Sequence, residues 1–135
     1  MKILREITPE VEKLFKDRNF ASFATVMEDG SPQVTPVWVD YAEGRILINT
    51  AQGRTKLRNV SRNPKVAVSV TDSSNPYTMV SVRGRIVEQD TGGADAHIDR
   101  MAKKYLNQDK YPFRAPGEKR VLLKISPESV TYMSP

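Results

Sequence analysis

The sequence contains no cysteine and only one histidine, His97. A chain without thiols forms no disulfide, no zinc–thiolate site and no cysteine nucleophile. A single imidazole also argues against a histidine-based metal site and against a Ser–His catalytic pair. We therefore expect no metal ion. His97 stands between Asp95 and Asp99 in a segment with helical periodicity, and we expect it on the protein surface.

Long apolar segments are also missing from the sequence. No run approaches the roughly 20 residues that a membrane-spanning helix requires. The first six residues, MKILRE, are too polar for a signal peptide. We expect a cytoplasmic protein with no membrane partner. The length of 135 residues suits one domain, residues 1–135, that can bury a hydrophobic core.

Acidic residues are absent from one long stretch of the chain. Residues 44–71 contain no Asp or Glu but six Lys or Arg residues, whereas the whole chain has a net charge of only +5. The six are Arg45, Arg54, Lys56, Arg58, Arg62 and Lys65. A cluster without counter-charges indicates an anionic partner, which can be a nucleic acid, a cofactor phosphate or an anionic substrate.

Three segments carry the signals of helices. The first begins at Thr8, an N-cap residue followed by proline and an acid, and we expect it to end near Asn19. Residues 55–63 form a short predicted helix that a following proline ends. Residues 94–106 repeat apolar side chains at i, i+3, i+4 and i+7, the pattern of an amphipathic helix.

The other regular segments are typical of strands. We expect them at residues 20–27, 33–41, 45–50, 65–71, 77–88 and 120–125, with residues 130–132 extending the last one. Asp29-Gly30 predicts a hairpin turn, Pro36 an edge strand and Gly84 a bulge. Six or seven strands and three helices predict an α+β, mainly β, antiparallel barrel with helices covering its ends.

The basic stretch occupies a position suited to binding a phosphate. A strand ending at Thr50 is followed by a short glycine-containing turn and then by a helix start. Backbone N–H groups at a helix start are unpaired and partly positive, so they bind phosphate readily. We predict one phosphate held by Arg54, Thr55 and Lys56, with Thr50 offering a further hydroxyl.

Two other interpretations of the basic residues need weighing. Arg58 and Arg62 are four residues apart on the predicted helix, and we favour a solvated helix face for them. A nucleic-acid partner is disfavoured, because no aromatic residue lies between Tyr41 and Tyr77 to stack on bases, and no recognised binding motif is present.

Three segments of the chain together resemble a known family. They are FASFATVMEDGSPQVTPVWVDY, ILINTAQGRTKLRNVSRNPKVAVSVTD and NPYTMVSVRGRIVE, in this order. The order resembles the pyridoxamine 5'-phosphate oxidase-like family of flavin-binding split β-barrels, and within it the branch that uses the deazaflavin coenzyme F420. The resemblance extends from about Ile7 to Tyr132.

The resemblance implies a six-stranded antiparallel split β-barrel with flanking helices. It also implies a homodimer with two cofactor sites at the subunit interface. The family's phosphate motif falls on Arg54, Thr55 and Lys56, and the strand from Gln33 to Trp38 would lie along the flavin ring. The implied cofactor-binding residues are Gln33, Thr35, Pro36, Val37, Trp38, Asn49, Thr50, Arg54, Thr55, Lys56 and Tyr77.

The implied function is that of an F420-dependent reductase, which transfers hydride from the reduced deazaflavin to a conjugated small-molecule acceptor. An FMN-dependent oxidase or reductase, or a non-catalytic flavin or tetrapyrrole carrier, stays open as an alternative. Tyr77 is a weak candidate for a proton donor, because an ordinary tyrosine has a pKa of ~10.

Arg83 and Arg85 share one face of a strand and either cover it or meet an anionic cofactor tail. No basic segment follows Tyr132 to grip a substrate phosphate, so oxidation of vitamin B6 is not expected.

Overall fold

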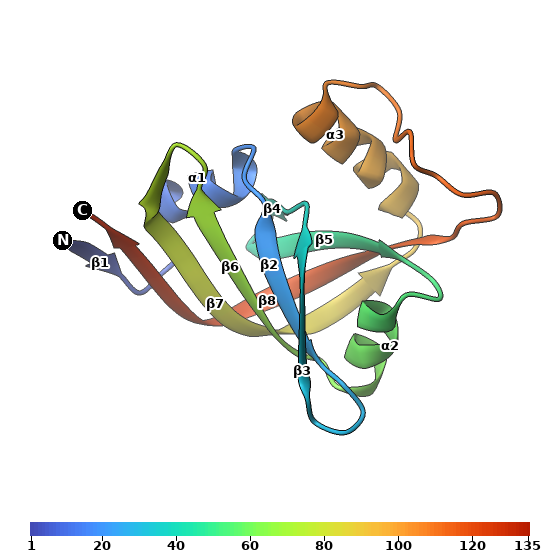
Figure 1. The fold of residues 1–135 in the computed structure, drawn as a ribbon, viewed down its shortest axis with the longest axis horizontal. Helices are drawn as coiled ribbons and strands as arrows, with labels where there is room; N and C mark the ends of the chain where they lie inside the picture. Colours follow the sequence, from blue (N-terminus) through green and yellow to red (C-terminus); the bar gives the residue numbers. More distant parts are fainter.

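A computed structural model describes residues 1–135 as a curled antiparallel sheet with three helices around it (Figure 1). The elements, in chain order, are β1 (Lys2–Leu4), α1 (Pro9–Lys16), β2 (Ala21–Val26), β3 (Pro32–Val37), β4 (Asp40–Ala42), β5 (Arg45–Ala51), α2 (Thr55–Arg62), β6 (Lys65–Asp72), β7 (Asn75–Asp90), α3 (Ala94–Leu106) and β8 (Arg120–Ser134). Each of the six predicted strands has a counterpart, and β1 and β4 are additional strands of three residues.

The sheet has the order β3-β2-β6-β7-β8-β5-β4, with β1 paired to the far end of β8. Every pairing is antiparallel. The long strands β7 and β8 cross the whole molecule, and β8 includes the predicted extension at residues 130–132. The predicted split β-barrel is confirmed. Its two sheet edges, β3 and β4, come from neighbouring parts of the chain.

The core fills the inside of this curved sheet. A cluster of 19 buried residues combines inward-facing strand side chains, such as Phe23 and Ile48, with the apolar stripe of α1. Alternation along β2 and β6 places mainly apolar side chains inside and mainly small or polar ones outside, which is the pattern of strands with one solvated face. None of the helices combines the length and apolarity needed to cross a bilayer.

The first helix begins as predicted and ends earlier than predicted. The Thr8 hydroxyl accepts a hydrogen bond from the Val11 N–H, so Thr8 is the N-cap. The helix ends at Lys16 rather than near Asn19. The Asn19 side chain is buried and donates to the Leu14 carbonyl near the helix end, which satisfies an acceptor that the helix leaves free.

The strand predicted from Gln33 onward also ends early, at Val37. The Val39 N–H donates to the hydroxyl of Tyr105 on α3, 3.1 Å away, so it makes no sheet bond. β3 is an edge strand, as Pro36 predicted, and the Asp29-Gly30 turn is present, with Gly30 at a φ of 88°. The predicted strand at residues 77–88 is longer than expected, because β7 already begins at Asn75 and ends at Asp90.

The bulge predicted at Gly84 is present in the centre of the sheet. The register of β7 against β8 shifts between Arg83 and Gly84. A Cβ atom at Gly84 would lie 2.2 Å from the Ser126 carbonyl oxygen, far inside contact distance. Only glycine therefore allows the two longest strands to approach this closely.

Candidate functional site

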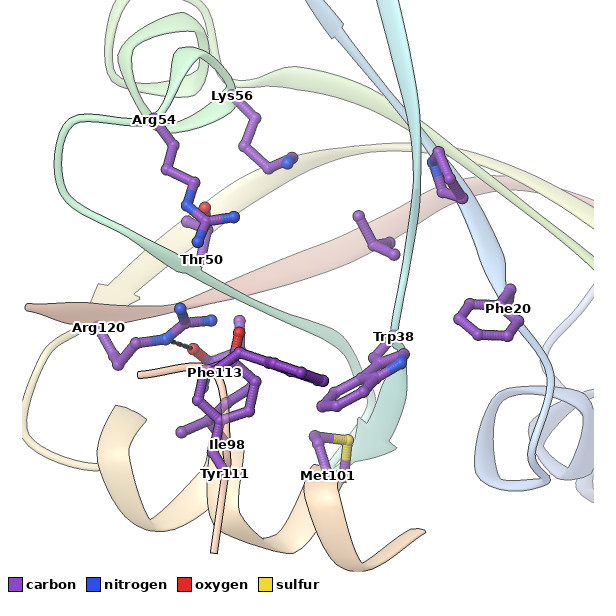
Figure 2. A pocket seen from close by; sticks show the side chains of 13 residues that line it. Phe20, Trp38, Thr50, Arg54, Lys56, Ile98, Met101, Tyr111, Phe113 and Arg120 are labelled. Atoms are coloured by element: carbon purple, nitrogen blue, oxygen red, sulfur yellow. Dashed lines mark hydrogen bonds between the residues drawn. The ribbon is translucent and has the colours of Figure 1, made fainter. Parts of the chain in front are cut away.

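A cavity of about 200 Å³ lies between the end of β3, the end of β5, the start of α2 and one face of α3 (Figure 2). Its lining residues are Phe20, Pro36, Val37, Trp38, Asn49, Thr50, Arg54, Lys56, Ile98, Met101, Tyr111, Phe113 and Arg120. One end of the cavity is cationic and the other is aromatic. The cavity lies at the gap between the two edges of the sheet, because no pairing joins β3 to β4 or to β5.

Three cations gather at one end of the cavity. Arg54 and Lys56 lie at the start of α2. Arg120 is the first residue of β8, where it pairs with Ala51 of β5. Figure 2 shows Arg54 reaching from α2 to Thr50 and Lys56 extending beside it into the cavity, with Arg120 on the far side of Thr50. Burial, together with the charges of Arg54 and Arg120, lowers the pKa of Lys56 below its ordinary value. A bound anion would relieve this repulsion.

Glu118 partly balances the cationic end. Its Oε1 lies 3.1 Å from Arg120 Nη1 and 3.5 Å from Arg54 Nη2. Arg120 is almost fully buried, while Arg54 is exposed. The surrounding protein therefore holds the Arg120 side chain in place, whereas Arg54 is open to solvent and would lose more side-chain freedom on binding a ligand.

The backbone and one hydroxyl at this end lack partners. No side chain caps the start of α2, and its first turn contains no acidic residue. The N–H groups there point outward with partial positive charge. Thr50 is 2% exposed and lines the cavity, yet its Oγ1 has no hydrogen-bond partner. A buried hydroxyl of this kind is normally satisfied, so the site lacks a polar group that a ligand could supply.

The other end of the cavity is a group of aromatic rings. Trp38 stacks on Tyr105 with centroids 5.1 Å apart and meets Tyr111 edge-on at 5.9 Å. Phe113 packs edge-on against Tyr111, and Phe20 packs against Tyr105. Trp38 thus serves both as a packing residue and as a wall of the cavity.

The loop of residues 107–119 carries two of these rings, and α3 holds it in place. The Tyr111 N–H donates to Asp99 Oδ1 at 2.9 Å, and Arg114 bridges Asp95 and Asp99. Arg120 also stacks on the Tyr111 ring, 5.1 Å from its centroid. These contacts connect the aromatic wall to the cationic end.

The structure gathers seven of the eleven predicted cofactor-binding residues around this cavity. They are Pro36, Val37, Trp38, Asn49, Thr50, Arg54 and Lys56. The other four, Gln33, Thr35, Thr55 and Tyr77, do not line it. Tyr77 is 78% exposed near the start of β7, so within one chain it does not reach the cavity.

Gln33, Thr35 and Thr55 have other local surroundings. Gln33 contacts the Thr25 hydroxyl inside the sheet, and the Thr35 hydroxyl is buried without a partner. The Thr55 hydroxyl accepts from Arg58, whose other nitrogen donates to the Gly53 carbonyl at 2.7 Å. Arg58 is exposed, as predicted. Its two hydrogen bonds also stabilise the turn before α2.

The prediction for His97 was wrong. His97 is 1% exposed and lies on the buried face of α3, with Ala94 and Met101. The flanking acids suggested a surface position, whereas the helical spacing of these three residues already indicated the buried stripe. The imidazole is tolerated inside because Asp40 and Asn49 are its hydrogen-bond partners.

Sequence reasoning missed six residues that line the cavity: Phe20, Ile98, Met101, Tyr111, Phe113 and Arg120. Ile98 and Met101 belong to the apolar stripe of α3, a pattern that indicates core packing rather than a cavity wall. The positions of Tyr111 and Phe113 depend on contacts of a loop. Arg120 becomes a neighbour of Asn49 through the pairing of β5 with β8, which no local pattern shows.

The two basic residues Arg83 and Arg85 lie outside this cavity. Arg83 and Arg85 line a second groove of about 480 Å³ on the outer face of the sheet, together with Lys65 and Glu128. The structure contains no group of three His, Asp or Glu side chains placed to hold a metal ion.

Comparison with known proteins defines the class of this molecule. A family profile described as "Pyridoxamine 5'-phosphate oxidase" matches residues 7–134. The chain belongs to this family, whose members include oxidoreductases and whose fold binds flavins or deazaflavins. The uncapped start of α2 and the unpaired Thr50 hydroxyl fit the phosphate of such a cofactor.

Solved structures with the same fold align with most of the chain. An F420 reductase is 29% identical, with a TM-score of 0.77, covering 88% of this chain and 94% of that one. HupZ of Group A Streptococcus is 18% identical, with a TM-score of 0.68 and coverage of 95% and 94%. General Stress Protein 26 of Bacillus anthracis is 18% identical, with a TM-score of 0.64 and coverage of 91% and 90%. No curated protein sequence matches the chain.

Proposed function

We propose that the chain is a reductase that depends on coenzyme F420 and acts on a conjugated small-molecule acceptor. One observation carries the proposal: a cationic pocket with an unsatisfied buried hydroxyl adjoins an aromatic-lined space in a single cavity. A cofactor with a phosphate and a planar ring needs both kinds of surface.

In this proposal the cationic end binds the cofactor phosphate. Arg54 and Lys56 supply charge-assisted hydrogen bonds, and Arg120 supplies a fixed charge behind them. The Thr50 hydroxyl donates to a phosphate or ribityl oxygen, which removes its unpaired state. The free N–H groups at the start of α2 add a partial positive charge of about half a unit.

The aromatic end positions the ring and the acceptor and excludes water from them. The bound reduced deazaflavin supplies the hydride. Trp38 and the loop residues Tyr111 and Phe113 provide flat apolar surfaces at this end. Burial raises the pKa of Tyr105 to about 12, and its hydroxyl donates to the Asn19 carbonyl, so it is no acid for the reaction. We assign the proton of the product to water or to Tyr77 of a second copy.

Two features favour F420 over FMN. The deazaflavin continues beyond its phosphate into a tail with several carboxylates, whereas FMN ends at the phosphate. An open groove beside the start of α2 is lined by Arg58 and Arg62, next to the phosphate site. The F420 reductase is also 29% identical to the chain over most of both lengths.

The cavity in one chain is too small for a complete cofactor site. Pockets for molecules of this size enclose roughly 300–1,000 Å³, and this one encloses about 200 Å³. Phe20 and Phe113 line the cavity, yet both side chains are largely exposed to solvent. We propose a homodimer in which a second copy completes the wall and brings Tyr77 to the ring.

Fluorescence titration of the purified apo-protein with F420 and, separately, with FMN tests the proposal. We expect tighter binding of F420, followed by consumption of reduced F420 when a conjugated acceptor is added. A preference for FMN would contradict the choice of cofactor and point to the flavin oxidases and reductases of the family. Binding without turnover across an acceptor panel would instead indicate a carrier.

A further inference from the structure

The buried His97 lies in a chain of hydrogen bonds that reaches the cationic end of the cavity. Its Nε2 is 3.2 Å from Asp40 Oδ2 on β4, and its Nδ1 is 3.2 Å from Asn49 Nδ2 on β5. Asn49 Oδ1 accepts from Arg120 Nε at 2.9 Å. The function proposed above does not use the imidazole, although three elements converge on it.

The partners of Asn49 determine how its amide is oriented. The Ala94 carbonyl only accepts, and it lies 2.8 Å from Asn49 Nδ2. The guanidinium of Arg120 only donates, and it faces Oδ1. The Nδ2 group has two hydrogens, of which one is directed to Ala94 and the other to His97 Nδ1. His97 Nδ1 must therefore carry a lone pair and act as an acceptor.

This requirement assigns the proton of the imidazole. If Nδ1 accepts, the neutral ring carries its hydrogen on Nε2, which donates to Asp40 Oδ2. Although burial raises the pKa of the Asp40 carboxyl, hydrogen bonds from His97 and from the Tyr41 N–H outweigh it, and the pKa lies below its ordinary value. Asp40 is thus a carboxylate at neutral pH and a pure acceptor, as the assignment requires.

We infer that His97 is a positioning residue, which orients Asn49 through its Nδ1 and thereby holds Arg120 at the cationic end of the cavity. Asp40 selects the imidazole tautomer that makes this possible. The inference deepens the proposed function, because Arg120 belongs to the phosphate site on which that function rests. His97 itself does not line the cavity.

The tautomer can be measured directly, because the chain has one histidine. A ¹⁵N spectrum of the ring at pH 8, in the protein without cofactor, will show one pair of ring nitrogens. We expect a protonated Nε2 and an unprotonated Nδ1. A proton on Nδ1, alone or together with Nε2, would overturn the inference.

Two substitutions at His97 distinguish the hydrogen bond that Nδ1 accepts from Asn49 from the one that Nε2 donates to Asp40. In His97→Asn the side-chain oxygen can take the place of Nδ1 and still accept from Asn49. In His97→Gln the amide nitrogen can take the place of Nε2 and reach Asp40, but the acceptor for Asn49 is lost. The Nε–H signal of Arg120, identified with Arg120→Lys, reports on the Asn49 bond in the unliganded protein.

We expect His97→Asn to keep the Arg120 signal and its slow exchange with water, and His97→Gln to shift the signal and speed exchange. Affinity for F420 or FMN should fall about three- to tenfold in His97→Gln, the effect of one hydrogen bond, and recover in His97→Asn. An unchanged Arg120 signal in folded His97→Gln would overturn the inference. If neither cofactor binds the wild-type protein, the proposed function fails, while the ring and Arg120 spectra still decide the role of His97.

Discussion

The environment of Lys104 disfavours the charged form of its side chain. Burial lowers its pKa to about 8, even though Asp40 and Asp17 act in the opposite direction. Its Nζ donates to the Phe15 carbonyl at 2.8 Å and to the Val39 carbonyl at 2.7 Å, and it lies 4.8 Å from the centre of the Tyr105 ring. This single side chain connects α3 to α1 and to the segment between β3 and β4.

The shift at Lys104 predicts an unusual pH dependence of stability. Below pH 8 the lysine is charged in both states, so the cost of burying the charge is fully present. Between pH 8 and the unfolded value of 10.5, the unfolded chain binds more protons, and the free energy of unfolding rises with pH. Relative to Lys104→Met, we expect the wild type to gain about 1 kcal/mol between pH 7.5 and 10 in urea titrations, because solvent screens the partly exposed side chain and reduces the full effect of the shift. A difference that stays flat or falls over this range would contradict the shift.

Arg54 and Lys56 are predicted to bind the cofactor phosphate. Removing both with Arg54→Ala/Lys56→Ala should weaken F420 binding by about 3 kcal/mol or more, since each charged hydrogen bond contributes about 1.5–3 kcal/mol. Fluorescence titration measures the loss. Arg100→Ala, which removes an exposed arginine from α3 outside the cavity lining, is the matched control. Equal affinity in the folded double variant and in the control would exclude the phosphate assignment.

Arg62 is predicted to meet the tail of the deazaflavin. Arg62→Glu should lower affinity for F420 with a long oligoglutamate tail by about tenfold, because a like charge replaces an opposite one. Affinity for FMN, which has no tail, should change little and serves as the internal control. An equal loss for both cofactors would show that Arg62 acts on the phosphate or on the fold instead.

At the scale of the element, the bulge in β7 is set by the space at Gly84. A methyl group there would overlap the Ser126 backbone oxygen. Because both strands lie in the middle of the sheet, neither can move aside without disturbing its neighbours.

Gly84→Ala should therefore destabilise the protein by about 3 kcal/mol, the upper range of overpacking effects. Urea denaturation measures the loss. Gly92→Ala is the matched control, since the added Cβ there would meet only the Asp90 carboxylate at an ordinary 3.6 Å. Equal stability of the two variants would contradict the steric account.

The short helix α2 depends on tertiary contacts for its stability. Eight residues are too few for an isolated helix in water. Asn59 is buried and donates to the Thr25 hydroxyl at 2.9 Å, which anchors the helix to β2, and Arg58 braces the preceding turn. Tertiary contacts thus hold the helix start, with its free N–H groups, at the cavity.

At the scale of the whole molecule, the outer face of the sheet is predicted to meet a second copy. Outward positions of β2 and β6 carry small side chains such as Ala24 and Ala67. Val34 on the edge strand β3 is 63% exposed. Ala24 and Ala67 share this face with the charged groove that Arg83 and Arg85 line. A second copy packed here would have the small and apolar positions at the core of the interface, where charged residues are depleted.

Val34→Glu should weaken the homodimer and, with it, the binding of F420, while the fold stays intact because the side chain points outward. Sedimentation measures the oligomeric state and fluorescence the affinity. Arg100→Glu is a control for an added negative charge on an exposed part of α3. A monomer that binds F420 as tightly as the wild type would contradict a shared site.

Local sequence determined six of the eight strands, the three helices and the contribution of Arg54 and Lys56 to the cationic end. Alternation and helical periodicity are short-range properties, so they appear in the chain before it folds. The turn at Gly30, the bulge at Gly84 and the edge strand at Pro36 follow from backbone restrictions of single residues. The predicted phosphate position rests on a strand, a glycine turn and a helix start that are adjacent in sequence.

The tertiary structure alone decided what completes the site. Arg120 reaches Asn49 across 71 positions because β8 pairs with β5, and His97 is buried because α3 packs on the same strands. Tyr111 and Phe113 face the cavity because Asp99 and Arg114 hold their loop. Such contacts depend on sheet order and on loop closure, which join distant segments and which no local pattern contains.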